Sequence, residues 1–243
     1  MTQLARAEDA TTATNVSFES QPPLTRSGLR TPRAAAIAGI VFSILLITSL
    51  WLLWISVPAD PLETGAWLAI SSARVTFALN LVPFAGIAFM WFLGVLRDRL
   101  GAREDKFFAT VFLGSGLMFL GMLFVAASAA AGLILAYTAA PNALPDRTAF
   151  TFARAFAYDV MRIYAFKMAA VFTITTSTLA LRTRFTAHWI AVVGYASAAV
   201  ILFGSGYFDW VLLVFPCWIL LVSTYILIDN LRGPARVAPG HGP

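Results

Sequence analysis

The chain of 243 residues carries few charged side chains: they make up 12% of it, about half of the roughly 25% found in soluble domains. Hydrophobic residues make up 59%. So few charges cannot cover a surface that faces water. This composition excludes a soluble globular domain and indicates that the solvent is lipid.

Cysteine and histidine are also scarce. Cys217 is the single cysteine and lies in an apolar run, which excludes disulfide frameworks and cysteine-ligated zinc or iron–sulfur sites. The two histidines, His188 and His241, border an apolar stretch and lie near the chain end, which excludes a bis-histidine haem inside a bundle. No GxSxG, HExxH, P-loop or paired intramembrane carboxylates occur. We therefore expect no enzyme activity, no cofactor and no metal site.

What the chain does contain is a series of apolar stretches, each near or above the roughly 20 residues that one membrane crossing needs. The predicted spans are 34–57, 75–96, 107–139, 148–181, 187–203 and 210–228. The sequence therefore predicts an all-α, polytopic membrane protein with one six-helix transmembrane domain at 34–229. A polar, disordered arm at 1–33 precedes this domain, and a short tail at 230–243 follows it.

The third and fourth spans are longer than one crossing requires, and Pro141 and Pro145 separate them. We expect these two helices to form a hairpin that extends past the membrane surface. The link between the last two spans, residues 204–209, is rich in glycine and is short enough only for a tight antiparallel turn.

Positive residues are segregated by this topology. One side of the membrane receives Arg6, Arg26, Arg30, Arg33, Arg97, Arg99, Arg103, Lys106, Arg182, Arg184, Arg232 and Arg236. The other side receives Arg74, Arg147 and Arg154, together with Asp60, Glu63, Asp146 and Asp209. By the positive-inside rule, both termini are cytoplasmic and the protein is a multi-pass protein of the plasma membrane. The net charge of +5 thus reflects topology and not a nucleic-acid partner.

The fourth span holds the candidate site. At 100° per residue, Asp159 and Arg162 lie about 60° apart and can pair, and Lys167 follows within two turns. Thr173 and Ser177 continue the same face, which forms a stripe of small and polar residues along the helix. Such a stripe faces other helices or a wet cavity, where charged residues are candidates for function.

A structural interpretation of these charges stays open beside the functional one. If the inner boundary of the membrane lies at Arg182, a crossing of about 20 residues places Arg162 at the outer boundary. The ion pair would then only end the crossing among the lipid headgroups, and Lys167 would reach them by snorkelling.

Two further features concern helix geometry. Asn80 and Pro83 form a candidate helix break of the kind that binds ions in transporters, although a plain kink is the commoner outcome. Gly121, Ser128 and Gly132 form a candidate helix-packing interface, for which a partner helix within the chain is favoured over one in another subunit.

Two classes of function remain. The favoured one is a small carrier or channel with a polar cavity along the fourth helix, in which Arg162 and Lys167 attract a small anionic solute. The alternative is an accessory or assembly subunit, docked through the third helix as a homo-oligomer or in a larger membrane complex. In both cases the lipid bilayer is the first partner.

Overall fold

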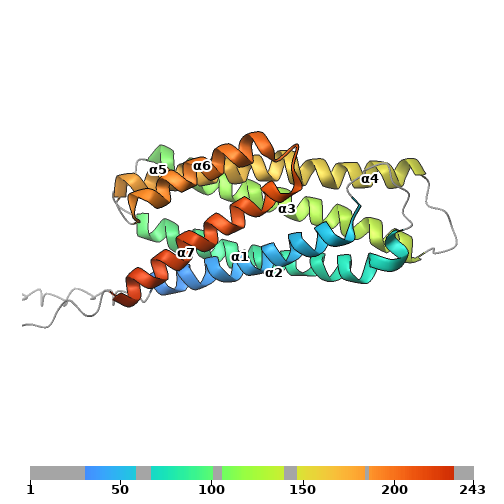
Figure 1. Cartoon of the computed structure of the whole chain (residues 1–243), viewed down its shortest axis with the longest axis horizontal. Helices are drawn as coiled ribbons and strands as arrows, with labels where there is room; N and C mark the ends of the chain where they lie inside the picture. The colour runs from blue at the N-terminus through green and yellow to red at the C-terminus, as the bar shows by residue number, and fades with distance from the viewer. Residues whose placement is uncertain (1–30, 59–66, 101–105, 140–146, 184–185, 233–243) are drawn as a thin grey trace, which may run out of the picture. The chain divides into compact units, whose positions relative to one another are not determined.

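The computed structural model describes residues 31–58, 67–100, 106–139, 147–183 and 186–232 (Figure 1). The α-helices are α1 (Thr31–Ser56), α2 (Leu68–Leu100), α3 (Lys106–Ala139), α4 (Arg147–Asp159), α5 (Phe166–Thr183), α6 (His188–Gly204) and α7 (Val214–Arg232). A π-helix, η3 (Val160–Ala165), joins α4 to α5, and a 3-10 helix, η4 (Asp209–Leu213), leads into α7. These residues are almost wholly helical and include no strand, so the all-α prediction is confirmed. Nearly all of the predicted N-terminal arm and most of the tail lie outside the described residues.

Five helical runs are long and apolar enough to cross a membrane by length and composition. They are Arg33–Ser56, Leu68–Arg97, Phe107–Ala139, Thr148–Arg182 and Asp209–Leu231. The remaining helix, α6, is apolar but has only 17 residues. The helices therefore fit a bundle embedded in a membrane.

Helix boundaries agree closely with the sequence for α1 and α3 but not for α2. The second span was expected at 75–96, whereas α2 has 33 residues and begins at Leu68. Its first turns include Ser71, Ser72 and Arg74, but Leu68 and Val75 are buried against Ile134 of α3 and Phe150 of α4. These tertiary contacts stabilise a helical segment that hydropathy alone does not select.

The helices pack as neighbouring pairs. α1 lies along α2 and is crossed by α7, while α5 packs against both α3 and α6. In Figure 1 the turn between α6 and α7 lies partway along the continuous run of α4, η3 and α5, not at its end. As a result α4, the start of α2 and the end of α3 continue beyond that turn, where they form a second small core (Figure 1).

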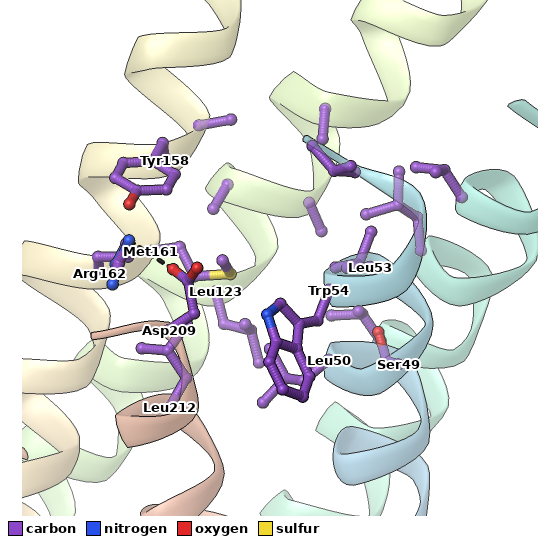
Figure 2. A pocket seen from close by; sticks show the side chains of 18 of the residues that line it. Ser49, Leu50, Leu53, Trp54, Leu123, Tyr158, Met161, Arg162, Asp209 and Leu212 are labelled. Carbon is purple, nitrogen blue, oxygen red and sulfur yellow. Dashed lines mark ion pairs between the residues drawn. The ribbon is translucent and has the colours of Figure 1, made fainter. Parts of the chain in front are cut away.

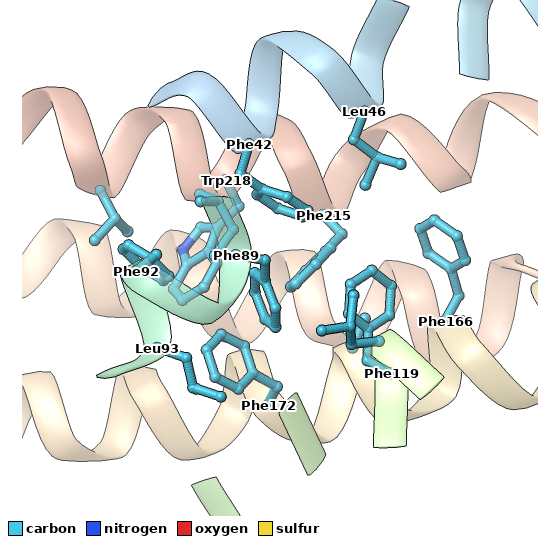
Figure 3. Packing of buried hydrophobic residues seen from close by; sticks show 14 of the residues in the cluster. Phe42, Leu46, Phe89, Phe92, Leu93, Phe119, Phe166, Phe172, Phe215 and Trp218 are labelled. Carbon is cyan, nitrogen blue, oxygen red and sulfur yellow. The ribbon is translucent and has the colours of Figure 1, made fainter. Parts of the chain in front are cut away.

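Phenylalanines form the main core, shown in Figure 3. Those at its centre are Phe42 of α1, Phe89 of α2, Phe119 of α3, Phe166 and Phe172 of α5, and Phe215 of α7. The ring centroids of Phe42 and Phe89 are 4.8 Å apart, as are those of Phe119 and Phe215. Lipid is as apolar as these rings, so close packing and ring geometry, not removal from water, hold the five helices together.

Glycines permit the closest helix contacts, but not at the positions expected. A Cβ atom added to Gly116 would lie 3.1 Å from Leu93 Cδ1 and 3.2 Å from Phe172 Cδ2. Gly121 and Gly132 lie about 140° and 160° around α3 from Gly116 at 100° per residue. A Cβ atom on either would meet no described atom within 4 Å, and Ser128 is exposed. Among the described residues, this face of α3 does not pack against another helix, because the buried phenylalanines of α3 turn its opposite face inward.

No helix break occurs at Asn80 and Pro83. α2 continues through Pro83, and both residues are exposed. Proline leaves the carbonyl one turn before it without its usual donor. Beside that position, the Ser49 hydroxyl of α1 donates a hydrogen bond of 2.8 Å to the carbonyl of Ala78. This bond joins α1 to α2 one residue before the freed carbonyl, and α2 does not unwind here.

Candidate functional site

An apolar cavity of about 190 Å³, here called the chamber, lies between α1, α2, α3, α4 and η4 (Figure 2). Its wall includes Leu53, Trp54, Leu123, Tyr158, Arg162 and Asp209. The chamber forms because the α6–α7 turn lies partway along the α4–α5 run and not at its end. As a result η4 closes one end of the chamber, and no described residue fills the space between α1 and α4 on the far side of η4. In Figure 2, Trp54 lies across the chamber from Arg162 and Asp209.

An ion pair forms the polar part of the chamber wall. Nη1 of Arg162 lies 2.7 Å from Oδ1 of Asp209, and the side chains are 3% and 38% exposed. Nε of Arg162 donates a hydrogen bond of 2.9 Å to the carbonyl of Ser205, in the turn before η4. The guanidinium carbon lies 4.5 Å from the ring centroid of Tyr158, within the range of a cation–π contact. Charge-assisted contacts of this kind are strong in a low dielectric.

One nitrogen of the Arg162 guanidinium has no hydrogen-bond partner in the part of the chain that the structure describes. Nη2 of Arg162 is buried and has no hydrogen-bond partner among the described residues. A buried donor without an acceptor costs about 1–3 kcal/mol, and more when it is charged. Arg162 is therefore a buried cation with binding capacity that the described part of the chain does not use.

The π-helix η3 explains why Arg162 is buried. Val160–Ala165 forms a wider turn inside an otherwise α-helical run, and π-turns of this kind occur frequently at functional sites. Asp159, just before η3, is exposed, whereas Arg162 within it is buried. The expected pairing of these two residues assumed uniform α-geometry; the structure instead pairs Arg162 with Asp209.

The other members of the predicted site do not line the chamber. Lys167 is exposed like Asp159, and Thr173 and Ser177 are buried among the helices. The Thr173 hydroxyl donates to the carbonyl of Ala169 at 2.8 Å, and Thr176 does the same to Phe172 at 2.7 Å. Threonine hydroxyls that bond to their own helix one turn back are satisfied without water, whereas Oγ of Ser177 is buried and has no hydrogen-bond partner among the described residues. Of the five predicted residues, the structure brings only Arg162 to the chamber.

Sequence reasoning missed Asp209 as a site residue, and it considered Arg154 as a candidate for chemistry but did not include it in the predicted site. Both Arg162 and the turn that contains Asp209 are expected at the outer boundary of the membrane. This shared depth was the one sequence feature that could have indicated their pairing. Arg154 Nη2 donates a hydrogen bond of 2.6 Å to the carbonyl of Pro58, and its guanidinium lies 5.8 Å from the Trp67 ring. Arg154 thus joins α4 to the residues that follow α1, at the rim of the chamber.

The apolar helices fit an integral membrane protein. No protein-family model matches the chain, and neither a curated protein nor a solved structure does. Within the described ranges, no three histidine, cysteine or acidic side chains gather as a metal site would require. Inferences about function therefore rest on the geometry of the chamber.

Proposed function

We propose that this protein is a carrier of the plasma membrane that binds a small amphipathic molecule in the chamber. The observation that carries the proposal is the buried Arg162–Asp209 pair in the wall of an otherwise apolar cavity. Apolar walls suit a hydrocarbon chain or ring, and a few placed polar groups orient the ligand, as in most small-molecule sites.

The proposed topology has six crossings, with both termini in the cytoplasm. The 17 residues of α6 span about 26 Å, slightly less than the roughly 30 Å of a hydrocarbon core. A locally thinner bilayer or flanking anchors accommodate such a difference. The segregation of positive residues supports the orientation.

This topology sets the depth of the chamber. With Arg182 at the cytoplasmic boundary, Arg162 lies about 30 Å away, at the outer boundary. Trp54, Trp67 and Trp210 line the chamber, and tryptophan is enriched at membrane interfaces. An amphipathic ligand would thus enter the chamber from the outer leaflet, with its polar end among the headgroups.

The elements around the ion pair favour a carrier over a passive bundle. Arg162 and Asp209 belong to η3 and η4, two segments that depart from α-geometry. Arg162 is 3% exposed, and a buried charge is costly unless a partner such as Asp209 compensates it. Separation of the ion pair would release η4 from η3. The end of the chamber that η4 closes would then open toward the bundle. A carrier that works by alternating access requires such an opening.

Lipid flipping tests this proposal. Full-length protein is reconstituted in vesicles that contain NBD-labelled lysophosphatidylglycerol or lysophosphatidylcholine, and dithionite bleaches the outer leaflet. Protein-free vesicles should lose about half of the fluorescence because the two leaflets share the probe, whereas the carrier should make nearly all of at least one probe accessible. Filling the chamber by Leu53→Trp should restore the protein-free result, and the exposed control Leu135→Trp should not. Equal bleaching with and without protein contradicts the carrier function.

A second candidate function, an accessory or assembly subunit, is favoured by the open face of α3. Gly114, Gly121, Ser128 and Gly132 are all exposed on this helix. The most apolar window of α3 is 28% buried, against 61% for the α4–α5 run. Small residues let the backbone of a partner helix approach closely. If this face docks a partner, Gly121→Leu should reduce the mass of the particle extracted in mild detergent; an unchanged mass would exclude this role for the face.

A further inference from the structure

The size of the chamber limits what it can hold. Its volume of about 190 Å³ is below the roughly 300–1,000 Å³ of sites for drug-sized ligands. A dry apolar cavity of about 150 Å³ takes up a molecule the size of benzene. Along α1 the wall extends from Leu46 to Pro58, about 18 Å at the rise of an α-helix. The chamber is thus too small for a lipid with two chains, and we expect it to take one alkyl chain along its α1 wall.

The polar wall limits the head group. Arg162 is 3% exposed; it uses Nε for the Ser205 carbonyl and Nη1 for Asp209, and leaves Nη2 without an acceptor. Asp209 is 38% exposed, so solvent screens its negative charge more than the buried positive charge of Arg162. The planar fork of a guanidinium matches the two oxygens of a carboxylate or phosphate. An oxyanion is thus the group that best satisfies Nη2.

The ring of Tyr158 stands over this guanidinium at 4.5 Å and is itself more than one-third exposed. A tyrosine at the surface can change rotamer at little cost, since one side of the ring faces the surroundings. Rotation of the ring would uncover the guanidinium, and the head group of a ligand would take its place.

We propose that the chamber binds a single-chain amphipathic oxyanion, such as an alkyl carboxylate or an alkyl phosphate, with its head group on Nη2 of Arg162 and its chain along α1 and α3. This proposal rests on the proposed function in one respect, the use of the chamber as the binding site. It adds the charge and the shape of the ligand.

Tryptophan quenching by bromine tests it, because Trp54 lines the chamber. Full-length protein in detergent is titrated at pH 8.5 with 11-bromoundecanoate, its neutral methyl ester and the cationic 11-bromoundecyltrimethylammonium. The carboxylate should quench saturably and bind about tenfold more tightly than the other two, the difference expected from one charge-assisted bond. Trp67 and Trp210 also line the chamber, so Trp54→Phe should reduce the saturable signal without removing it, whereas Trp91→Phe, at a tryptophan outside the chamber, should leave it unchanged.

Arg162→Lys should weaken binding of the carboxylate about fivefold or more, because lysine lacks the planar fork. The comparison of head groups on the unmodified protein needs no variant, so it decides the question even if Arg162→Lys fails to fold. Equal affinity for the three probes, or no saturable quenching by any of them, overturns the inference. Saturable binding of the carboxylate without lipid flipping leaves this inference standing and removes the carrier function. Lipid flipping together with equal affinity for the three head groups supports the carrier function and overturns this inference.

Discussion

Arg162 of η3 and Asp209 of η4 form an ion pair with 2.7 Å between Nη1 and Oδ1, and the pair joins a π-helix to a 3-10 helix. The contact holds the turn after α6 against the middle of the α4–α5 run. Because η4 closes one end of the chamber, this one contact both positions the cavity wall and supplies its charge.

Asp209→Asn should destabilise the protein. The substitution leaves a guanidinium that is 3% exposed without its counter-ion. Removal of one partner of a buried pair costs about 3–5 kcal/mol, and we expect about 2–4 kcal/mol because Asp209 is partly exposed. Thermal unfolding in detergent measures the change, with the exposed Asp159→Asn as the matched control, expected within about 0.5 kcal/mol. Equal unfolding temperatures for the two variants would contradict the role assigned to the pair.

Gly194→Ala should destabilise the contact between α5, α6 and α7. An added Cβ atom would lie 2.9 Å from Nε1 of Trp218 and even closer to the Ser177 hydroxyl. Overpacking of this kind costs about 1–3 kcal/mol. Gly121→Ala meets nothing within 4 Å and should be neutral or slightly stabilising, because alanine favours a helix over glycine by about 1 kcal/mol. The midpoint of thermal unfolding checks both, and a larger loss at Gly121 would refute the packing described for α3 and α6.

Phe89→Ala should weaken the aromatic core. Its ring lies within 5.5 Å of the rings of Phe42, Phe119 and Phe172, measured between centroids. In a membrane the cost comes from the cavity left behind, for which we expect about 2 kcal/mol. Phe107→Ala, at an exposed phenylalanine, is the control and should change the unfolding midpoint little. Similar losses for both variants would show that the rings do not form the core of the folded protein.

Cysteine labelling checks the proposed orientation. In a Cys217→Ser background, Tyr207→Cys lies in the α6–α7 turn at a position that is 82% exposed, and His188→Cys lies at the opposite end of α6. A maleimide that does not cross membranes should label residue 207 on intact cells, but residue 188 only after permeabilisation. The reverse pattern would place the termini outside, against the distribution of positive residues.

Hydropathy and length predict most of this fold because each crossing is a local property of the chain. The expected limits of the first and third spans, 34–57 and 107–139, differ from Thr31–Ser56 and Lys106–Ala139 by three residues or fewer. The early start of α2 was not predictable in this way, since it depends on contacts of Leu68 and Val75 with α3 and α4.

The site was predictable only in part. The place of Arg162 on the polar stripe predicted that it faces other helices or a cavity, but neither the π-turn around it nor its partner was predictable from this pattern. An i, i+3 rule selects Asp159 from the same helix, whereas the π-turn and the early α6–α7 turn bring Asp209 to the arginine. The glycines of α3 likewise lie on two faces, Gly116 on one and Gly121 and Gly132 on the other. The buried rings of Phe112 and Phe119 show that the face of Gly116 packs against the other helices, which the glycine pattern alone does not reveal.

Photo-crosslinking tests the chamber as the binding site most directly. Vesicles containing the full-length protein are loaded with tetradecanoate that carries a diazirine at the end of its chain, irradiated, and digested for peptide mass spectrometry. The account predicts labelling at chamber residues such as Leu53 of α1 and Leu123 of α3, which excess unlabelled tetradecanoate suppresses. Labelling confined to exposed positions such as Leu117 and Leu135, and unaffected by the competitor, would contradict it.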